Sequence, residues 1–364
     1  MKKLWILLIV FAVLIPIKGW TQDLSPHSED VSWELNLDPA TAGFRYDDNV
    51  YRSPLDADRL TDGIVSGDWG GVAKASYDIF KAHLGYHLGD DQYLNYTELN
   101  NLKNDIDLLF ALEPFEWSFY YKFDYFLRAS QYYDFNYFDV DSVLGVRWTP
   151  AGAYAYEVQY RNLTRQYFDT DPSVWSKNFV DQSGSLSVQR EIDDRFSLKL
   201  LGSYTNREFN RYAVSDDGGV LSSLNDLQND NTWKFLLNAH VYFASILQDI
   251  NIEGQRTDSN SYGFSNWVES FSWAGVIKPS SGFYLQLFFR LYLKYYDQNP
   301  LNLPDLQLGF VDEDSQDLLA VKANWDLDSD WVGSIGVSRI RSESDQPNAY
   351  YIKDIISGQI RRSF

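Results

Sequence analysis

Residues Phe283–Tyr296 read Phe-Tyr-Leu-Gln-Leu-Phe-Phe-Arg-Leu-Tyr-Leu-Lys-Tyr-Tyr. Successive side chains of a β-strand point to opposite faces of the sheet, so every second residue of this segment would share a face. One face would carry only Phe, Leu and Tyr, and the other would include Gln286, Arg290 and Lys294. A membrane β-barrel requires this division, because lipid contacts one face of each strand and a polar interior contacts the other.

Similar alternation recurs along most of the chain. We predict an all-β fold, a transmembrane antiparallel up-and-down β-barrel of about 16 strands, with both termini in the periplasm because the strand number is even. Residues Val31–Leu37 alternate as well and either extend the first strand or lie in the periplasm, so about 14 or 18 strands are the alternatives. The predicted strands are Gly43–Arg52, Trp69–Tyr77, Ala82–Leu88, Asp105–Leu112, Trp117–Arg128, Phe138–Thr149, Tyr154–Arg165, Gln182–Arg190, Phe196–Phe209, Thr232–Phe243, Asp249–Thr257, Ser265–Ile277, Phe283–Tyr296, Asp317–Trp325, Trp331–Arg341 and Tyr350–Phe364.

Short and long connections alternate between these strands. Short periplasmic turns and longer outer loops are typical of such barrels. A large soluble β-sandwich or propeller also favours aromatic residues in strands, but it gives little reason for this alternation. The predicted turns are Asp78–Lys81, Glu113–Glu116, Pro150–Ala153, Glu191–Arg195, Ala244–Gln248, Lys278–Gly282 and Asp326–Asp330, and the longest loops are Gln166–Asp181, Asn210–Asn231 and Asp297–Gln316.

Aromatic residues directly follow several of the short turns. We expect them to form a girdle at the periplasmic boundary of the lipid. Glu269 is predicted on the same face as Trp267 and Phe271, where a charge is costly unless it lies near the outer interface. The predicted girdle residues are Trp117, Tyr154, Phe196, Phe283 and Trp331.

The N-terminus has the pattern of a secretory signal peptide. Lys2 and Lys3 precede an apolar run from Leu4 to Ile17, which is too short for a typical membrane helix. We predict a signal peptide over residues 1–22, a periplasmic N-terminal segment over 23–42 and the transmembrane barrel over 43–364. An uncleaved N-terminal anchor is the alternative.

The composition excludes several classes of function. The chain has a net charge of −20 and no Cys. Nucleic-acid binding needs a basic face, and thiolate metal sites and disulfides need Cys, so none of these is expected.

The acidic side chains of the predicted loops either keep the surface solvated or bridge through divalent cations to anionic surface glycolipid. No segment has the spacing of an EF-hand, and we predict no cofactor or dedicated metal site. The loop acids include Asp56, Asp58, Asp62, Asp216, Asp217, Asp226, Asp230, Asp312, Glu313 and Asp314.

The sequence offers no recognisable catalytic site. It contains 4 His residues, and no Gly-x-Ser-x-Gly, P-loop or zinc motif. His83 and His87 share a strand face, but residues four apart on a strand are separated by about 13 Å and cannot chelate one metal. His240 would face inward beside Asn238 and Tyr242 without a nucleophile. We therefore predict that the protein is not an enzyme.

The face opposite the apolar stripe collects charges of both signs. Either they neutralise one another in a packed interior, or they line a hydrated channel and set its selectivity; barrels of about 16 strands normally leave such a channel. Inward aromatic residues such as Tyr120, Phe126, Phe288, Tyr292 and Tyr351 would narrow the bore and offer stacking surfaces for sugar rings. The predicted lumen-lining residues are Arg45, Asp47, Lys122, Asp124, Arg128, Asp139, Asp141, Arg147, Glu157, Arg161, Lys199, Arg207, Lys234, Glu253, Arg290, Lys294, Lys322 and Lys353.

Three segments resemble known outer-membrane barrels. The C-terminal Ile356–Phe364 resembles the terminal signal read by the barrel assembly machinery, with Phe364 as its aromatic end and Arg362 as a departure from its apolar pattern. Tyr46–Tyr51 and the Tyr-rich Tyr86–Asn100 are similar to segments of barrels found with exopolysaccharide and surface-assembly systems. The resemblance implies a place in surface export or assembly and assigns no functional residue.

Three functions are compatible with this sequence. The first is a porin-like outer-membrane channel for small hydrophilic solutes. The second is an export or assembly component for surface polysaccharide or another envelope polymer, and the third is a non-conducting structural barrel. The expected partners are outer-membrane lipid, the barrel assembly machinery and a hydrophilic solute or glycan, and the oligomeric state is left open.

Overall fold

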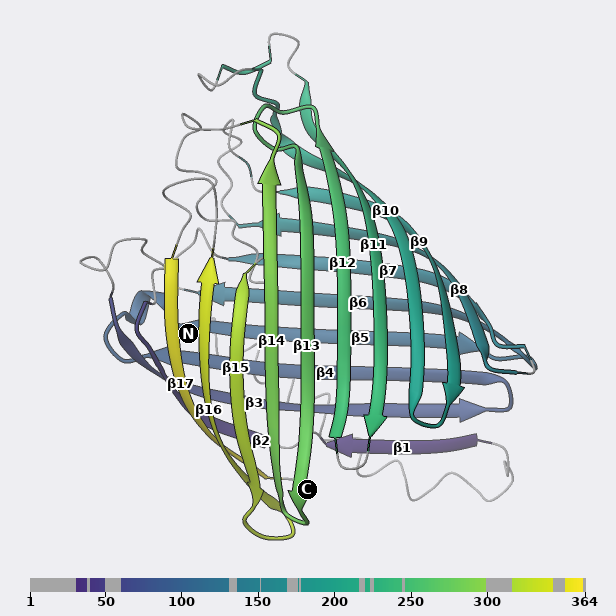
Figure 1. Ribbon diagram of the computed structural model, residues 1–364, viewed down its shortest axis with the longest axis vertical. Coiled ribbons are helices and arrows are strands. Elements are labelled where there is room, and N and C mark those ends of the chain that lie inside the picture. The colour runs from purple at the N-terminus through teal and green to yellow at the C-terminus, as the bar shows by residue number, and fades with distance from the viewer. Residues whose placement is uncertain are drawn as a thin grey trace, which may run out of the picture.

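A single β-barrel dominates the computed structural model (Figure 1). The structure describes residues 31–37, 40–49, 60–130, 136–150, 152–168, 176, 178–215, 220–222, 226–243, 246–298, 316–342 and 351–362. The predicted signal peptide and Phe364 therefore lie outside the described residues. Among the residues that are described, no helix is long and apolar enough to cross a membrane.

The strands follow one another along the chain with one short 3-10 helix, η2 (Thr97–Leu99), between β4 and β5. Every predicted strand has an observed counterpart. The strands are β1 (Val31–Leu37), β2 (Ala40–Asp47), β3 (Asp62–Tyr77), β4 (Phe80–Tyr93), β5 (Asn101–Leu112), β6 (Trp117–Ser130), β7 (Tyr137–Trp148), β8 (Tyr154–Tyr167), β9 (Phe179–Asp193), β10 (Phe196–Tyr212), β11 (Leu227–Phe243), β12 (Ile246–Ser259), β13 (Asn266–Ser280), β14 (Phe283–Tyr296), β15 (Asp317–Asp326), β16 (Trp331–Ser342) and β17 (Tyr351–Arg362).

Strands β2 to β17 form a closed barrel. Each strand pairs antiparallel with its neighbours in the chain, and β17 pairs with β2 from Ile355↔Asp47 to Arg362↔Ala40, which closes the sheet. The prediction of an all-β antiparallel up-and-down barrel is confirmed, with 16 strands in the closed ring. Closure matters because an open sheet edge in lipid would leave backbone N–H and C=O groups without partners.

Strand β1 continues the line of β2 along the edge of β3. Val31–Leu37 pairs with Gly71–Tyr77, whereas β2 pairs with the preceding part of β3, from Asp62 to Asp68. This is the extended first strand that the alternation of Val31–Leu37 left open. Strand pairing consequently begins before Gly43, the predicted start of the barrel, which falls inside β2.

Several strands extend further than the sequence predicted, mainly toward the end of the barrel that carries the long loops. Strand β3, for example, begins at Asp62 rather than Trp69, and β11 begins at Leu227 rather than Thr232. These added residues are mostly polar, so they carry no apolar alternation that would reveal a strand. At the opposite end, which we call the short-turn end, β3 and β4 are separated only by Asp78 and Ile79, and Asp78 adopts a φ of 50°.

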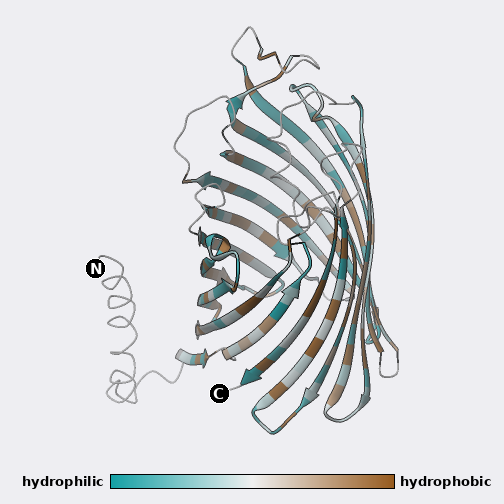
Figure 2. Cartoon of the chain, turned by 90° about the vertical axis from the view of Figure 1, so that its left-hand side faces the viewer, coloured by the Kyte–Doolittle hydropathy of each residue, from teal (hydrophilic) through white to brown (hydrophobic). Residues whose placement is uncertain are grey.

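Hydrophobic and hydrophilic residues alternate along many of the strands (Figure 2), and the strand pairing assigns them to opposite faces of the barrel wall. Phe44, Tyr46 and Val65 lie on one face and are 49%, 42% and 47% exposed. Asp47 and Asp62 lie on the other face, where they pair in register and are each 1% exposed. Apolar side chains thus face outward, where lipid would cover them, and polar side chains face inward.

Aromatic rings form a continuous stack on the outer face at the short-turn end. The ring centroids of Trp117 and Trp148 are 5.6 Å apart, those of Trp148 and Tyr156 5.4 Å, and those of Tyr156 and Tyr154 6.2 Å. The predicted girdle residues begin strands β6, β8, β10, β14 and β16 at this end. Such amphipathic rings suit the boundary between lipid and water.

Glu269 lies on the outer face near the long-loop end. Glu269 is the fourth residue of β13, which begins at Asn266. Its Oε1 accepts a hydrogen bond of 3.1 Å from the Nε1 of Trp267. This position close to the rim satisfies the condition under which a charge on this face is tolerable.

A buried ion pair joins the two strands that close the barrel. The Nζ of Lys353 on β17 lies 2.7 Å from Asp47 on β2, and the two side chains are 14% and 2% exposed. Asp47 also accepts a hydrogen bond from the backbone N–H of Asn49, whose Nδ2 donates to the carbonyl of Ile352. These contacts tie the first strand to the last where ring closure depends on them.

Replacing Asp47 with Asn should destabilise the barrel strongly. The substitution removes the carboxylate that lies 2.7 Å from Lys353, and breaking a buried pair in this way costs about 3–5 kcal/mol. The measurement is thermal unfolding in detergent micelles, followed by the mobility of unheated samples on SDS gels. Glu34→Gln, which disrupts the exposed Lys74–Glu34 pair, is the control and should change stability little. If both substitutions lowered the unfolding temperature equally, the Lys353–Asp47 pair would contribute no more to stability than an exposed pair.

Candidate lumen of the barrel

Cross-strand pairing places every predicted lumen-lining residue on the inner face. The assignment follows from register, because residues that pair directly share a face. Asp124, for example, pairs with Asp107 and Asp141, and Arg207 pairs with Asp181 and Asp230. The inner-face set comprises Arg45, Asp47, Lys122, Asp124, Arg128, Asp139, Asp141, Arg147, Glu157, Arg161, Lys199, Arg207, Lys234, Glu253, Arg290, Lys294, Lys322 and Lys353.

Part of this inner charge is neutralised by pairs between neighbouring or next-but-one strands. Arg165 holds Asp139 through two hydrogen bonds of 2.8 Å, and Arg207 holds Asp181 through two of 2.7 Å. Bidentate pairs of this kind combine charge with fixed geometry. Further pairs are Arg161–Asp141 at 2.8 Å, Lys103–Asp91 at 3.0 Å, Lys234–Glu253 at 2.8 Å and Lys199–Glu157 at 3.7 Å.

The paired arginines also stack on aromatic rings near the long-loop end. Arg165 lies 4.4 Å from the ring centroid of Tyr137 and 5.6 Å from that of Phe179. Arg207 lies 4.1 Å from the Phe179 centroid on its other side, and Arg211 lies 4.4 Å from that of Phe209. Each guanidinium is thus held by cation–π contact as well as by its polar partner. These contacts connect the strands of the wall from β7 to β10.

A row of carboxylates crosses three neighbouring strands deeper in the barrel. Asp107, Asp124 and Asp141 are direct cross-strand partners in sequence order. The outer two have side-chain partners, since His83 Nε2 lies 2.8 Å from Asp107 and Arg161 pairs with Asp141. Asp124, in the middle, forms no ion pair with any residue that the structure describes. Like charges in direct register destabilise a sheet, so repulsion among these three carboxylates lowers the stability of the barrel.

Each described histidine faces its own carboxylate. His83 pairs with Asp107, His87 lies 3.7 Å from Asp68, and His240 lies 3.3 Å from Asp249. Across the described ranges, no group of three or more His, Cys, Asp or Glu side chains has the geometry to hold a metal ion. His27 lies outside the described residues.

The wall from β13 through β17 to β2 is predominantly basic. Its inner carboxylates within the described residues are Asp47, which Lys353 neutralises, and Asp326 at the short-turn end. The inner cations of this wall are Arg45, Arg290, Lys294, Lys322, Lys353 and Arg361.

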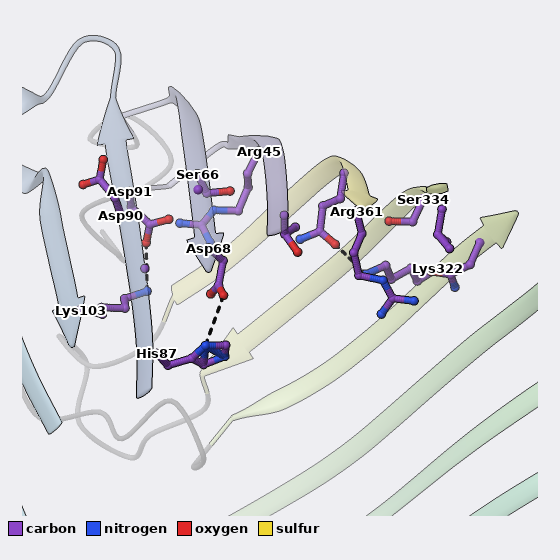
Figure 3. Close-up of a pocket in the computed structure, with 16 residues that line it drawn as sticks. Arg45, Ser66, Asp68, His87, Asp90, Asp91, Lys103, Lys322, Ser334 and Arg361 are labelled. Atoms are coloured by element: carbon purple, nitrogen blue, oxygen red, sulfur yellow. Dashed lines mark hydrogen bonds and ion pairs between the residues drawn. The ribbon is translucent and has the colours of Figure 1, made fainter. Parts of the chain in front are cut away.

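A cavity of about 610 Å³ lies where this basic wall meets β3, β4 and β5 (Figure 3). Arg45, Lys322 and Arg361 contribute to it from β2, β15 and β17. Asp68 and His87 contribute from β3 and β4. The remaining lining residues are mostly small and polar: Thr41, Ser66, Gly67, Gly89, Asp90, Asp91, Lys103, Asn324, Val332, Ser334 and Gln359.

Several residues of this inner surface were not among those predicted. Asp62, Asp68 and Asp91 fall outside the predicted limits of β3 and β4, and Asp181 falls inside a predicted loop. The signal that could have found Asp181 is the polar alternation of Asp181, Ser183, Ser185 and Ser187, which continues the inner face of β9.

Comparison with known proteins identifies the fold. No protein family model matches the chain. No curated protein matches it either. A loop-deletion variant of OmpT, an outer membrane protein of Vibrio cholerae, is 9% identical with a TM-score of 0.52, covering 92% of this chain and 100% of that one.

Two other solved structures show comparable coverage. OprB of Pseudomonas putida is 9% identical with a TM-score of 0.51, covering 95% of this chain and 97% of that one. A bacterial polysaccharide outer membrane secretin is 7% identical with a TM-score of 0.45, covering 90% and 99%. The OmpT variant and OprB, with TM-scores above 0.5, share with this chain the fold of a bacterial outer-membrane β-barrel. The closed ring and its apolar outer face place the protein in that membrane.

Asp124→Asn should stabilise the barrel slightly. Removing the central charge relieves cross-strand repulsion worth about 0.2–1 kcal/mol. Asp139→Asn is the matched comparison, because it removes the same charge from a carboxylate that Arg165 holds in two hydrogen bonds, and it should destabilise by about 1.5–3 kcal/mol. Thermal unfolding in micelles measures both. If both substitutions shifted stability in the same direction, the two carboxylates would not differ as their geometry indicates.

Proposed function

We propose that the protein is an outer-membrane channel, not an enzyme, and that it passes small hydrophilic solutes through a charge-lined lumen. The observation that carries this proposal is the incomplete pairing of the inner charges. A packed, dry interior needs almost every buried charge to be matched and hydrogen-bonded. Asp124 and the cations Arg45, Lys322 and Arg361 form no ion pair among the described residues, so water or solute is the natural partner for them. A ring of 16 strands is also wide enough for a water-filled bore.

A second candidate function is export of an anionic envelope polymer. The basic wall from β13 to β2 favours it, because its cations extend from Arg361 near the short-turn end to Lys294 near the long-loop end. A polymer carrying repeated negative charges could follow such a track. Under either proposal, a signal peptide over residues 1–22 would direct secretion of this chain to the periplasm. The barrel assembly machinery would then recognise Phe364 and insert the barrel into the outer membrane.

Single-channel recording of the refolded full chain in planar lipid bilayers tests the channel. We expect steady, ohmic openings, because a lumen that holds water conducts ions. A salt gradient then gives a reversal potential whose sign reports which inner charges dominate, and Asp124→Asn should move it toward greater anion preference.

A correctly folded barrel that never conducts would overturn the diffusion-channel proposal. Folding is established independently by the mobility of unheated protein on SDS gels, so silence cannot be ascribed to failed refolding. Silent but folded protein would leave a gated exporter or a structural barrel.

A further inference from the structure

We propose that the cavity between β2, β15, β17 and β3–β5 is a binding site for an oxyanion, carried as the carboxylate or phosphate group of a hydrophilic solute. This inference deepens the proposed channel function by naming its solute class, and it rests on that function. The proposal starts from an imbalance in partners between the two sides of the cavity.

Three of the four Arg and Lys side chains that line the cavity lack a carboxylate partner, and the fourth, Lys103, pairs with Asp91. Arg45, Lys322 and Arg361 form no ion pair with any residue that the structure describes. The Nε of Arg45 is buried and has no hydrogen-bond partner among the described residues. Lys322 donates to the neutral Oε1 of Gln359 at 2.7 Å. A buried donor without an acceptor costs free energy, which a bound ligand oxygen would recover.

The acids of the cavity, by contrast, already have partners. Asp68 lies 3.7 Å from Nδ1 of His87, and Asp91 lies 3.0 Å from Nζ of Lys103. Asp90 accepts hydrogen bonds of 2.7 and 2.9 Å from Nε2 of Gln92. The four Arg and Lys side chains that line the cavity outnumber its three Asp side chains by one, so its formal charge, not counting His87, is positive.

The strand register explains why the cations stay free. Arg45 pairs with Ser357 on one side and Ile64 on the other. Lys322 pairs with Gly336 and Gln286. Small or neutral residues thus occupy the nearest positions on adjacent strands, where an acid would have neutralised these cations.

The cavity also has the size and polarity for a solute the size of a sugar. Its volume of about 610 Å³ falls within the range of small-molecule sites, about 300–1,000 Å³. Thr41, Ser66 and Ser334 supply hydroxyl groups, and Asn324 supplies an amide. Hydroxyls and amides suit the neutral part of a saccharide, while guanidinium and ammonium groups suit its anionic part.

The test is calorimetric titration of the refolded full-length barrel in detergent with two probes, inorganic phosphate and glucuronate. The variants are Arg45→Gln, Lys322→Gln and Arg361→Gln. Each removes one charge-assisted contact, so binding of the preferred probe should weaken about tenfold or more. Arg45→Lys keeps the charge and should retain more affinity than Arg45→Gln. Binding of phosphate alone would indicate a phosphorylated solute, and binding of glucuronate alone a carboxylated sugar.

Lys81→Gln is the control, because it removes the same charge from an inner-face lysine that pairs with Glu113 and lies outside the cavity. It should change affinity less than twofold. If Lys81→Gln weakened binding as much as the cavity variants do, the effect would come from the overall charge of the lumen and not from a site in the cavity. If the wild-type protein bound neither probe, the proposed site would be wrong. Conductance of the same preparations separates the two proposals. A conducting barrel that binds neither probe refutes the site alone, and a binding barrel that never conducts refutes the channel alone.

Discussion

The structure depends on one constraint: within lipid, every backbone N–H and C=O group must find its partner inside the protein. A sheet meets this condition only by closing on itself, so the pairing of β17 with β2 is as necessary as that of any two consecutive strands. Closure fixes an inside and an outside, and the twofold alternation of side chains then assigns each residue to one of them. The buried Lys353–Asp47 pair lies between β2 and β17, which come from opposite ends of the sequence and are therefore not joined by a turn as consecutive strands are.

The inner face uses charge in two different ways. From β7 to β10, Asp139–Arg165 and Asp181–Arg207 are matched with bidentate geometry and stacked on aromatic rings. Such groups have little capacity left for a solute, and they connect the strands of the wall. On β2, β15 and β17, by contrast, Arg45, Lys322 and Arg361 have small or neutral residues as their cross-strand neighbours. Unmatched charge costs stability in a dry interior but little in a wet one, so the contrast between the two walls supports the proposal of a hydrated lumen.

The sequence could predict the strands and the inner face because both follow from a period of two that repeats in almost every segment. It could not predict the long-loop ends of the strands, since residues such as Asp62 and Leu227 extend the pairing where no apolar face is required. It also could not predict which inner charges meet. Asp107, Asp124 and Asp141 form one row only because the stagger between β5, β6 and β7 brings them level, and stagger is a property of the whole ring.

The net charge of the chain does not predict the local charge of the inner wall. The chain carries a net charge of −20, which taken alone would indicate a preference for cations. Yet a permeating solute responds to the local field of the wall it passes and not to the total charge of the protein, because charges further away than about 8–10 Å are screened at physiological salt. On the inner face of β3 to β9, five acids form ion pairs with Lys or Arg (Asp91, Asp139, Asp141, Glu157 and Asp181), whereas Arg45, Lys322 and Arg361 form none with any described residue. An acidic protein can therefore present a positive site to its lumen.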